Sequence, residues 1–361
     1  LKKVTRMNKV IPTDRPVCVT GGSGYIASWI IQYLLAAGHT VHATVRDPSK
    51  AKSVAHLEAI AARESGTLKL FKADLLDIGS FDAAMAGCAV VIHTASPFIL
   101  EGFTDAHEAL VRPAVEGTRN VLDAVNRTPS VQRVVLTSSV ASVFGDNIDV
   151  RQVEGGVLTE AQWNTTSSVD HNPYQYSKVA AEREAWDMQA VQNRWDLVTI
   201  NPGMVYGPSL TTGSQSASID TLISMGDGRL RSGVPDLKYG VVDVRDVAKA
   251  HILAAFKPEA EGRHLLVSKT ISMIEIAKIL RAHFGKAYPF PKSVVPKAVV
   301  WLFGPMMGPV TRTFISKNVG HPLAFDNQRS IALGVEYLPV EQTFIEHFQQ
   351  VLDDGQVKRR A

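Results

Sequence analysis

The sequence contains few cysteines and no hydrophobic run long enough to cross a membrane. Cys18 and Cys88 are the only two cysteines among 361 residues, which excludes a disulfide framework and indicates a reducing environment. The longest uncharged apolar stretch, residues 298–310, is too short to span a bilayer, and glycines and prolines interrupt it. Residues 1–13 are polar and lack the apolar centre of a signal peptide. We therefore expect a cytoplasmic protein with no integral membrane segment.

An excess of charge of either sign is also absent. The chain has 38 Lys and Arg against 35 Asp and Glu, a net charge of +3, and no long basic stripe, so a nucleic acid is excluded as the main partner. The 11 histidines are scattered, and no spacing typical of a metal site occurs. With 45% hydrophobic residues, the chain is globular and can bury a large core.

Strand and helix patterns alternate over the first two thirds of the chain. Short β-branched or apolar runs alternate with longer segments whose apolar residues have helical spacing. The expected strands are 17–20, 40–45, 68–71, 89–93, 133–137, 197–200 and 239–244, and the expected helices are 25–35, 49–62, 80–86, 105–125, 172–192 and 246–256. This order predicts an α/β fold with a Rossmann-type, doubly wound parallel sheet and right-handed crossovers.

The pattern changes after residue 206, where glycines, prolines and polar residues become frequent. The Rossmann domain is predicted over 14–206 and 237–256. A smaller, mostly C-terminal α/β lobe is predicted over 207–236 and 257–355, and residues 1–13 and 356–361 are expected to be flexible termini.

A glycine-rich turn separates the first strand from the first helix. Gly21, Gly24 and Ala27 form the pattern G-x-x-G-x-x-A, in which the glycines allow a tight turn and a close backbone approach. The helix start directs free N–H groups and the positive end of its dipole toward one point, which suits a phosphate. Glycines at such a place also serve as a simple turn, so the motif alone leaves both interpretations open.

Two further elements carry candidate chemistry. Tyr174 and Lys178 are four residues apart on one helix face, and an ammonium next to a phenol favours the phenolate and lowers the phenol pKa. Ser138 and Ser139 follow the strand 133–137, where a hydroxyl can hydrogen-bond a substrate carbonyl and stabilise an oxyanion. Each element also occurs by chance, as helix packing or as the start of a turn.

In this order and spacing, the glycine turn, the serine and Tyr-x-x-x-Lys resemble the extended short-chain dehydrogenase/reductase superfamily. The chain is most similar to its dihydroflavonol-reductase-like group, which includes cinnamoyl-CoA reductases and microbial aldehyde and ketone (carbonyl) reductases. The segments 43–48, 73–75, 93–97 and 113–122 are typical of that group, and the resemblance covers residues 16–256 well.

The resemblance implies an NADP-dependent oxidoreductase that reversibly reduces an aldehyde or ketone to an alcohol. Tyr174 would donate the proton to the carbonyl oxygen, and Lys178 would activate Tyr174. Ser139 would be the second hydrogen-bond partner of that oxygen. Asn120, on the long helix behind the site, has an equally good role in local structure. The Rossmann domain would contact NADP(H) through Gly21, Ser23, Gly24, Tyr25, Ile26, Arg46, Lys50, Asp74, Leu75, Thr94, Ala95, Ser96, Tyr174, Lys178, Pro202, Gly203 and Val205.

The choice between NADP and NAD depends on the end of the second strand. Arg46 can hold a ribose 2′-phosphate through paired, charge-assisted bonds, and Lys50 and Lys52 follow it. Asp47 could instead serve a free ribose hydroxyl if the turn shifted by one residue. The arginine and the resemblance favour NADP(H).

The substrate lobe departs from the plant reductases of flavonoids. Those enzymes carry an asparagine five residues beyond the serine, where this chain has Phe144. We expect a mainly apolar pocket for a small carbonyl or alcohol, lined by Phe98, Phe144 and Met225, with Gln215 as a polar contact. Any of these side chains could instead be part of the core.

Three alternatives remain. A sugar-nucleotide epimerase or dehydratase would keep NAD bound and could use Arg229 and Arg231 for a diphosphate. A hydroxysteroid dehydrogenase is the second alternative. A non-catalytic NADP-sensing module would use the fold for binding alone, although such proteins commonly lose the tyrosine or the lysine. The protein is expected to be a monomer or a homodimer.

Overall fold

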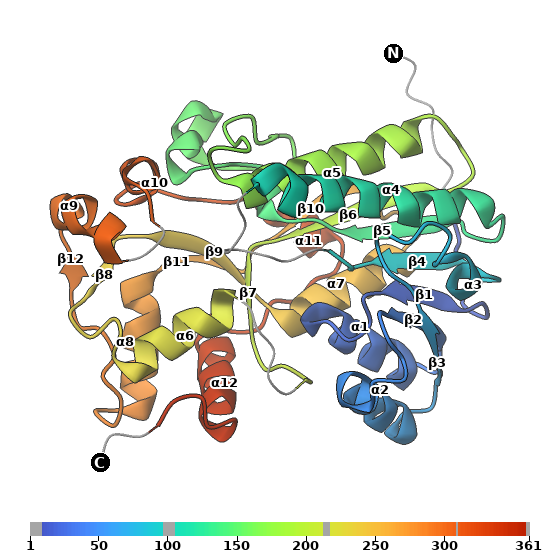
Figure 1. Ribbon diagram of the computed structural model, residues 1–361, viewed down its shortest axis with the longest axis horizontal. Coiled ribbons are helices and arrows are strands. Elements are labelled where there is room, and N and C mark those ends of the chain that lie inside the picture. Colours follow the sequence, from blue (N-terminus) through green and yellow to red (C-terminus); the bar gives the residue numbers. More distant parts are fainter. Residues whose placement is uncertain (1–8, 97–104, 212–216, 308–309, 359–361) are drawn as a thin grey trace.

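The computed structural model describes residues 9–96, 105–211, 217–307 and 310–358. Its centre is a parallel sheet of seven strands in the order β10-β6-β5-β4-β1-β2-β3 (Figure 1). The strands are β1 Val17–Thr20, β2 Thr40–Val45, β3 Thr67–Lys72, β4 Val90–His93, β5 Arg133–Thr137, β6 Asp196–Pro202 and β10 Gly262–Leu266. Every residue of β1 and β4 is buried, as expected for strands covered on both faces.

Helices cover both faces of this sheet. In Figure 1, α4 and α5 lie side by side over one face, and α1, α2 and α7 lie over the other. The helices are α1 Tyr25–Ala36, α2 Ala51–Arg63, α3 Asp82–Met85, α4 Arg112–Arg127, α5 Pro173–Ala190 and α7 Val244–Phe256, with a π-helical turn at His107–Val111 before α4. The predicted doubly wound parallel α/β fold is therefore confirmed.

The remaining elements form the smaller lobe. They include a sheet in the order β11-β9-β7 and a two-stranded pair of β8 and β12. The strands are β7 Met204–Tyr206, β8 Val234–Pro235, β9 Lys238–Asp243, β11 Lys269–Ser272 and β12 Val294–Val295. The helices are α6 Ala217–Asp227, α8 Met273–Phe284, α9 Lys297–Met307, α10 Arg312–Asn318, α11 Gln328–Ala332 and α12 Val340–Asp353, and short 3-10 turns lie at Val140–Ser142, Asn147–Gln152 and Glu154–Gly156.

Two strands pair differently from the sequence-based division of the chain. The predicted Rossmann part includes the strand at 239–244, but β9 lies between β7 and β11 in the small sheet. The predicted lobe includes residues 257–355, but β10 pairs with β6 at the edge of the central sheet. A strand pattern identifies a strand and not its neighbours, so this difference lay beyond local sequence.

The segments predicted to be flexible termini contribute to the core. Ile11 is 3% exposed and packs into the core of the central sheet, and the ammonium of Lys9 donates to the carbonyls of Gln132 and Arg194. Val357 is 5% exposed in the core of the lobe. Within the described residues, no helix has the length and apolar character needed to cross a membrane.

Candidate active site

The glycine turn leaves the start of α1 open. Gly21 has a φ of +67°, and a Cβ there would lie 3.0 Å from Cα of Ala95, so a larger residue would be strained and crowded. Gly24 caps α1 without a side-chain hydrogen bond, and no acidic residue lies in the first turn. The N–H groups near Ser23 and Ile26 thus meet no competing carboxylate, which suits an anionic group.

Tyr25 points away from this turn. Its hydroxyl donates to the carbonyl of Gly207 at 2.5 Å, and Trp29 on the same helix donates to the carbonyl of Pro208 at 2.8 Å. The two side chains therefore join α1 to the segment where the chain enters the lobe. Because the hydroxyl of Tyr25 is engaged with Gly207, the part of Tyr25 suited to the predicted cofactor contact is its backbone N–H, which can meet a phosphate.

The end of β2 presents positive charge to solvent. Arg46 and Lys50 are exposed, and Lys72 at the end of β3 is exposed in register with Val45. The carboxylate of Asp47 accepts hydrogen bonds from the N–H (3.0 Å) and hydroxyl (2.6 Å) of Ser49, and these bonds hold the pKa of Asp47 below its usual value. Asp47 is thus engaged locally. The position of Lys72 near Arg46 could not be predicted from the sequence, because it depends on the pairing of β3 with β2.

The loop after β3 is held from behind by Asn120. Its side-chain amide donates to the carbonyls of Leu75 (3.0 Å) and Asp77 (2.8 Å), which identifies Asn120 as a buried structural residue. A Cβ at Gly117 would lie 3.1 Å from Cβ of Leu75, so α4 and this loop are in close contact. Asp74 remains exposed at the start of the loop.

The chain after β4 is fixed against the glycine turn through Thr20. The hydroxyl of Thr94 donates to the carbonyl of Thr20 at 2.5 Å, and the N–H of Ala95 donates to the hydroxyl of Thr20 at 3.1 Å. That hydroxyl also lies 2.8 Å from Nδ1 of His93. Burial, together with the charge of Lys178, lowers the pKa of His93 to about 3, so the imidazole stays neutral.

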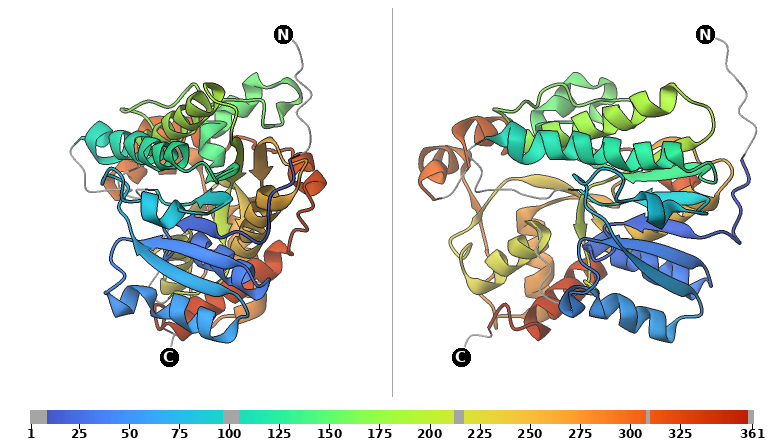
Figure 2. Two further views of the ribbon diagram at one scale, coloured as in Figure 1. Left: turned by 90° about the vertical axis from the view of Figure 1, so that its right-hand side faces the viewer. Right: turned by 45° about the vertical axis from the view of Figure 1, so that its right-hand side comes forward.

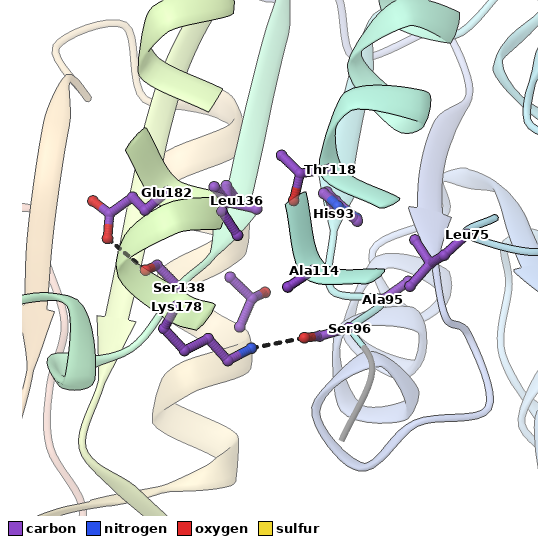
Figure 3. A pocket seen from close by; sticks show the side chains of 12 residues that line it. Leu75, His93, Ala95, Ser96, Ala114, Thr118, Leu136, Ser138, Lys178 and Glu182 are labelled. Atoms are coloured by element: carbon purple, nitrogen blue, oxygen red, sulfur yellow. Dashed lines mark hydrogen bonds between the residues drawn. The ribbon is translucent and has the colours of Figure 1, made fainter. Parts of the chain in front are cut away.

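Lys178 extends from α5 toward the segment after β4. Its ammonium donates to the hydroxyl of Ser96 at 2.7 Å, the interaction drawn in Figure 3, and lies 5.4 Å from the centre of the Tyr174 ring. The predicted one-turn neighbours on α5 are therefore in contact, and Lys178 connects them to Ser96. Helical spacing indicated the first relationship, whereas only the fold brings in Ser96.

Burial opposes the predicted lowering of the phenol pKa, and the structure shows a shift in the other direction. Burial raises the pKa of Tyr174 to about 12, and burial lowers the pKa of Lys178 to about 8. Burial shifts the pKa of each group toward the neutral form, because desolvation penalises charge more strongly than the neighbouring group stabilises it. At neutral pH the phenol is neutral, whereas Lys178, with a pKa of about 8, is still mostly charged. A phenol with a raised pKa still carries its proton at neutral pH and can donate it.

The two serines after β5 have different partners. The hydroxyl of Ser138 is buried and donates to Oε2 of Glu182 at 2.5 Å (Figure 3). Ser139 is partly exposed, and its Oγ accepts a hydrogen bond from the N–H of Ala141 at 3.1 Å. That bond leaves the hydroxyl proton of Ser139 able to meet a carbonyl oxygen, which supports Ser139 over Ser138.

Glu182 is a site residue that the sequence analysis missed. It lies one helical turn beyond Lys178, accepts from the amide of Asn201 at 2.8 Å, and pairs with the guanidinium of Arg263 at 2.7 Å. Arg263 also donates to Oγ of Ser142 and lies over the ring of Trp163. The spacing of four residues after Lys178 was the available signal, but the partner on β10 was not accessible from local sequence.

A small pocket lies between α4 and α5 at the carboxyl ends of β4 and β5 (Figure 3). It brings together the predicted residues Leu75, Ala95, Ser96 and Lys178. The remaining lining residues are His93, Ala114, Thr118, Leu136, Thr137, Ser138, Ala181 and Glu182. This is the edge of an open α/β sheet where ligands bind.

The chain passes from the central sheet to the lobe at Gly203. A Cβ at this position would lie 2.3 Å from the carbonyl oxygen of Gly240, so only glycine fits. Pro202 ends β6 and Val205 lies in β7, and the N–H of Gly203 donates to the carbonyl of Leu266. The three residues predicted to meet the nicotinamide ring therefore lie at the junction of the two sheets.

The predicted substrate residues are only partly accounted for. Phe98 and Gln215 lie outside the described residues. Phe144 is partly buried, and its ring lies edge-on to that of Phe325, with 5.5 Å between the ring centres. Met225 requires a correction, because it is fully buried in the core of the lobe and packs there with residues such as Phe348.

Known proteins with similar sequences are reductases. Cinnamoyl-CoA reductase CAD2 of Medicago truncatula is 38% identical over 331 residues, which covers 90% of this chain and 92% of that protein. An anthocyanidin reductase of Vitis vinifera is 37% identical over 287 residues, which covers 76% of this chain and 81% of that protein. The structure of yeast methylglyoxal/isovaleraldehyde reductase Gre2 complexed with NADPH superposes with a TM-score of 0.75 at 25% identity and covers 95% of this chain and 100% of that one.

These likenesses confirm the predicted oxidoreductase class and the resemblance to the extended short-chain reductases, and the NADPH complex accords with the predicted cofactor. The model of the NAD dependent epimerase/dehydratase family matches residues 17–268, which include the glycine turn, Ser139, Tyr174 and Lys178. The chain belongs to the NAD dependent epimerase/dehydratase family, in its extended short-chain dehydrogenase/reductase branch.

Proposed function

We propose that the protein reduces an aldehyde or ketone to an alcohol with NADPH, in a reversible reaction. The observation that carries this proposal is the contact of Tyr174, Lys178 and Ser96 beside the end of β5, where Ser139 lies. This arrangement has a proton donor, a cation and a hydroxyl at the ligand-binding edge of the sheet.

The residues present fit a phosphorylated dinucleotide. The turn at Gly21 and the uncapped start of α1 suit a pyrophosphate. The exposed cations Arg46, Lys50 and Lys72 suit a ribose 2′-phosphate, while Asp47 is engaged with Ser49. The NADPH complex of the yeast relative supports the same assignment.

Bound NADPH supplies the hydride that the carbonyl carbon receives. In this proposal Ser139 donates a hydrogen bond to the carbonyl oxygen and stabilises its developing negative charge. The phenol of Tyr174 gives its proton to the same oxygen, and Lys178 holds ribose hydroxyls from the side of Ser96. Burial keeps Tyr174 protonated at neutral pH, which is the form that a proton donor needs.

The proposed substrate is a small, mainly apolar carbonyl compound. Phe144 and Phe325 form an aromatic pair on the lobe side of the segment that carries Ser139. Apolar walls with few polar groups favour such a ligand over a nucleotide sugar. The yeast relative is named as a reductase of methylglyoxal and isovaleraldehyde, which are small carbonyl compounds.

Tyr174→Phe tests the proposal, with Tyr176→Phe on the same helix as the matched control. The loss of nicotinamide absorbance is followed with a panel of aldehydes, ketones and hydroxysteroids. We expect kcat to fall at least about 100-fold in Tyr174→Phe, with NADPH affinity within about two-fold of the wild type because the phenyl ring remains. Tyr176→Phe should keep wild-type turnover. Full turnover by Tyr174→Phe, or tightly retained NAD without any response to NADPH, would overturn the proposal.

A further inference from the structure

The exposed apolar side chains of the lobe gather on one helix. Val299, Trp301, Leu302, Phe303, Met306 and Val310 are 40–81% exposed, and we call this set the apolar tip. Helix α9, which carries most of it, lies at the end of the lobe away from the central sheet (Figures 1 and 2). Large exposed hydrophobic residues elsewhere, such as Ile78 and Val191, do not form such a run along one helix.

The apolar tip contributes little to the core of the lobe. Helix α9 contacts α10, and a Cβ at Gly304 would lie 3.0 Å from Cδ1 of the buried Ile315. The inward side of α9 is therefore the side of Gly304, and the six side chains of the apolar tip face water. A contiguous exposed apolar surface of this kind marks an interaction site.

The segment of sequence that carries the apolar tip is basic. Residues 276–325 contain seven Lys and Arg and no Asp or Glu. Lys292 is exposed before α9, and the exposed Arg312 lies over the ring of Trp301 at 4.8 Å. Asp146, a carboxylate from elsewhere that meets this segment at Lys317, is fully buried. The charged side chains that this segment itself contributes around the apolar tip are therefore positive, and those of Lys292 and Arg312 are exposed to solvent.

We propose that the apolar tip docks the protein onto a lipid surface rich in anionic headgroups. Exposed tryptophan, phenylalanine and leucine side chains insert at the boundary between headgroups and acyl chains, and nearby cations are attracted to anionic lipids. Helix α9 has 11 residues and contains Pro305, so it is too short to cross a bilayer and lies in the plane of the surface.

A second copy of this chain fits the same surface less well. In a symmetric dimer each patch meets its own copy, so two segments without a single acidic residue would face each other. Like charges placed together oppose such a contact. The basic border therefore favours an anionic lipid surface over self-association.

Vesicle flotation of the full chain tests the proposal. Vesicles of phosphatidylcholine with about a third phosphatidylserine should bind the protein, and vesicles of phosphatidylcholine alone should bind it at least about ten-fold more weakly. Replacing Trp301 and Phe303 together by serine should reduce binding at least about ten-fold, and Lys292→Gln or Arg312→Gln about five-fold each. Val191→Ser, which removes a more exposed apolar side chain far from the apolar tip in sequence, is the control and should bind like the wild type.

A second measurement on the wild type keeps the test independent of variant folding. All five tryptophans lie in the described residues, and Trp301 is the exposed one, so lipids with brominated acyl chains should quench part of the fluorescence and shift it to the blue. Absence of binding, equal binding to neutral vesicles, or a dimer in sedimentation that Trp301→Ser dissociates would each overturn the proposal.

Discussion

Nε of Arg263 lies 2.7 Å from Oε1 of Glu182, and both side chains are buried. The pair joins β10, at the edge of the central sheet, to the helix that carries Tyr174 and Lys178. Glu182 also accepts from Ser138 and Asn201, so one carboxylate connects the ends of β5 and β6 to α5. This ion pair therefore holds in place the elements on which the proposed active site depends.

Removing one partner of this pair should destabilise the fold strongly. Glu182→Gln leaves the guanidinium of Arg263 buried without its counter-charge, which costs about 3–5 kcal/mol in the free energy of unfolding. Urea denaturation measures this change. Arg112→Gln, which removes an exposed arginine that pairs with Glu108 and Glu116, is the control and should unfold at the same urea concentration as the wild type. An unchanged midpoint for Glu182→Gln would show that the pair contributes nothing.

The rate of carbonyl reduction should decrease in alkaline solution. Because burial lowers the pKa of Lys178 to about 8, its ammonium is present below that pH and is lost as the pH rises through it. The phenol of Tyr174, with a pKa of about 12, stays protonated over this range and adds no second step. We expect kcat/KM, which reports ionisations of the free enzyme, to fall about ten-fold per pH unit above about 8.

The variant Lys178→Arg identifies the group responsible for this decrease. A guanidinium stays charged throughout this range, so the alkaline decrease should disappear even if the overall rate is lower. A wild-type profile that is flat to pH 10, or a decrease that persists in Lys178→Arg, would assign the ionisation to another group.

Arg46 should determine the preference for NADPH over NADH. In Arg46→Ala the dissociation constant for NADPH should rise about 10- to 100-fold, because charge-assisted bonds to the 2′-phosphate are lost, and that for NADH should change less than about three-fold. Fluorescence titration measures both constants. Arg63→Ala, at the other end of α2, is the control, and Lys72→Ala should give a smaller effect in the same direction. Equal losses for the two cofactors would contradict this assignment.

Gly203→Ala should disturb the junction of the two sheets. The new Cβ of residue 203 would lie 2.3 Å from the carbonyl oxygen of Gly240. This clash is with backbone, so it can be relieved only if the end of β6 moves away from β9. We expect a loss of about 3 kcal/mol in the free energy of unfolding. Gly304→Ala in α9 should be tolerated, because the new Cβ would meet only the end of the Ile315 side chain, which can move. Comparable stability of the two variants would show that the junction can relax.

The amino-acid sequence by itself determined the order and type of the elements that build the site. The strand expected at 133–137 coincides with β5, and the one at 40–45 with β2. The glycine turn and the pair Tyr174 and Lys178 could also be predicted from the sequence, because the residues in each are only three or four positions apart. Hydrophobic periodicity and helical spacing are local properties, and a sequence displays them directly.

Only the tertiary structure decided which distant residues meet and how burial changes them. Glu182 and Arg263 are 81 positions apart, Lys178 and Ser96 are 82 positions apart, and no periodic pattern relates the members of either pair. The membership of β9 and β10 in their sheets and the burial of Met225 depend in the same way on neighbours that are remote in the chain. The shift of the Tyr174 pKa, opposite to the expected one, has the same physical reason: desolvation depends on everything packed around a group, and spacing along one helix reports only a single neighbour.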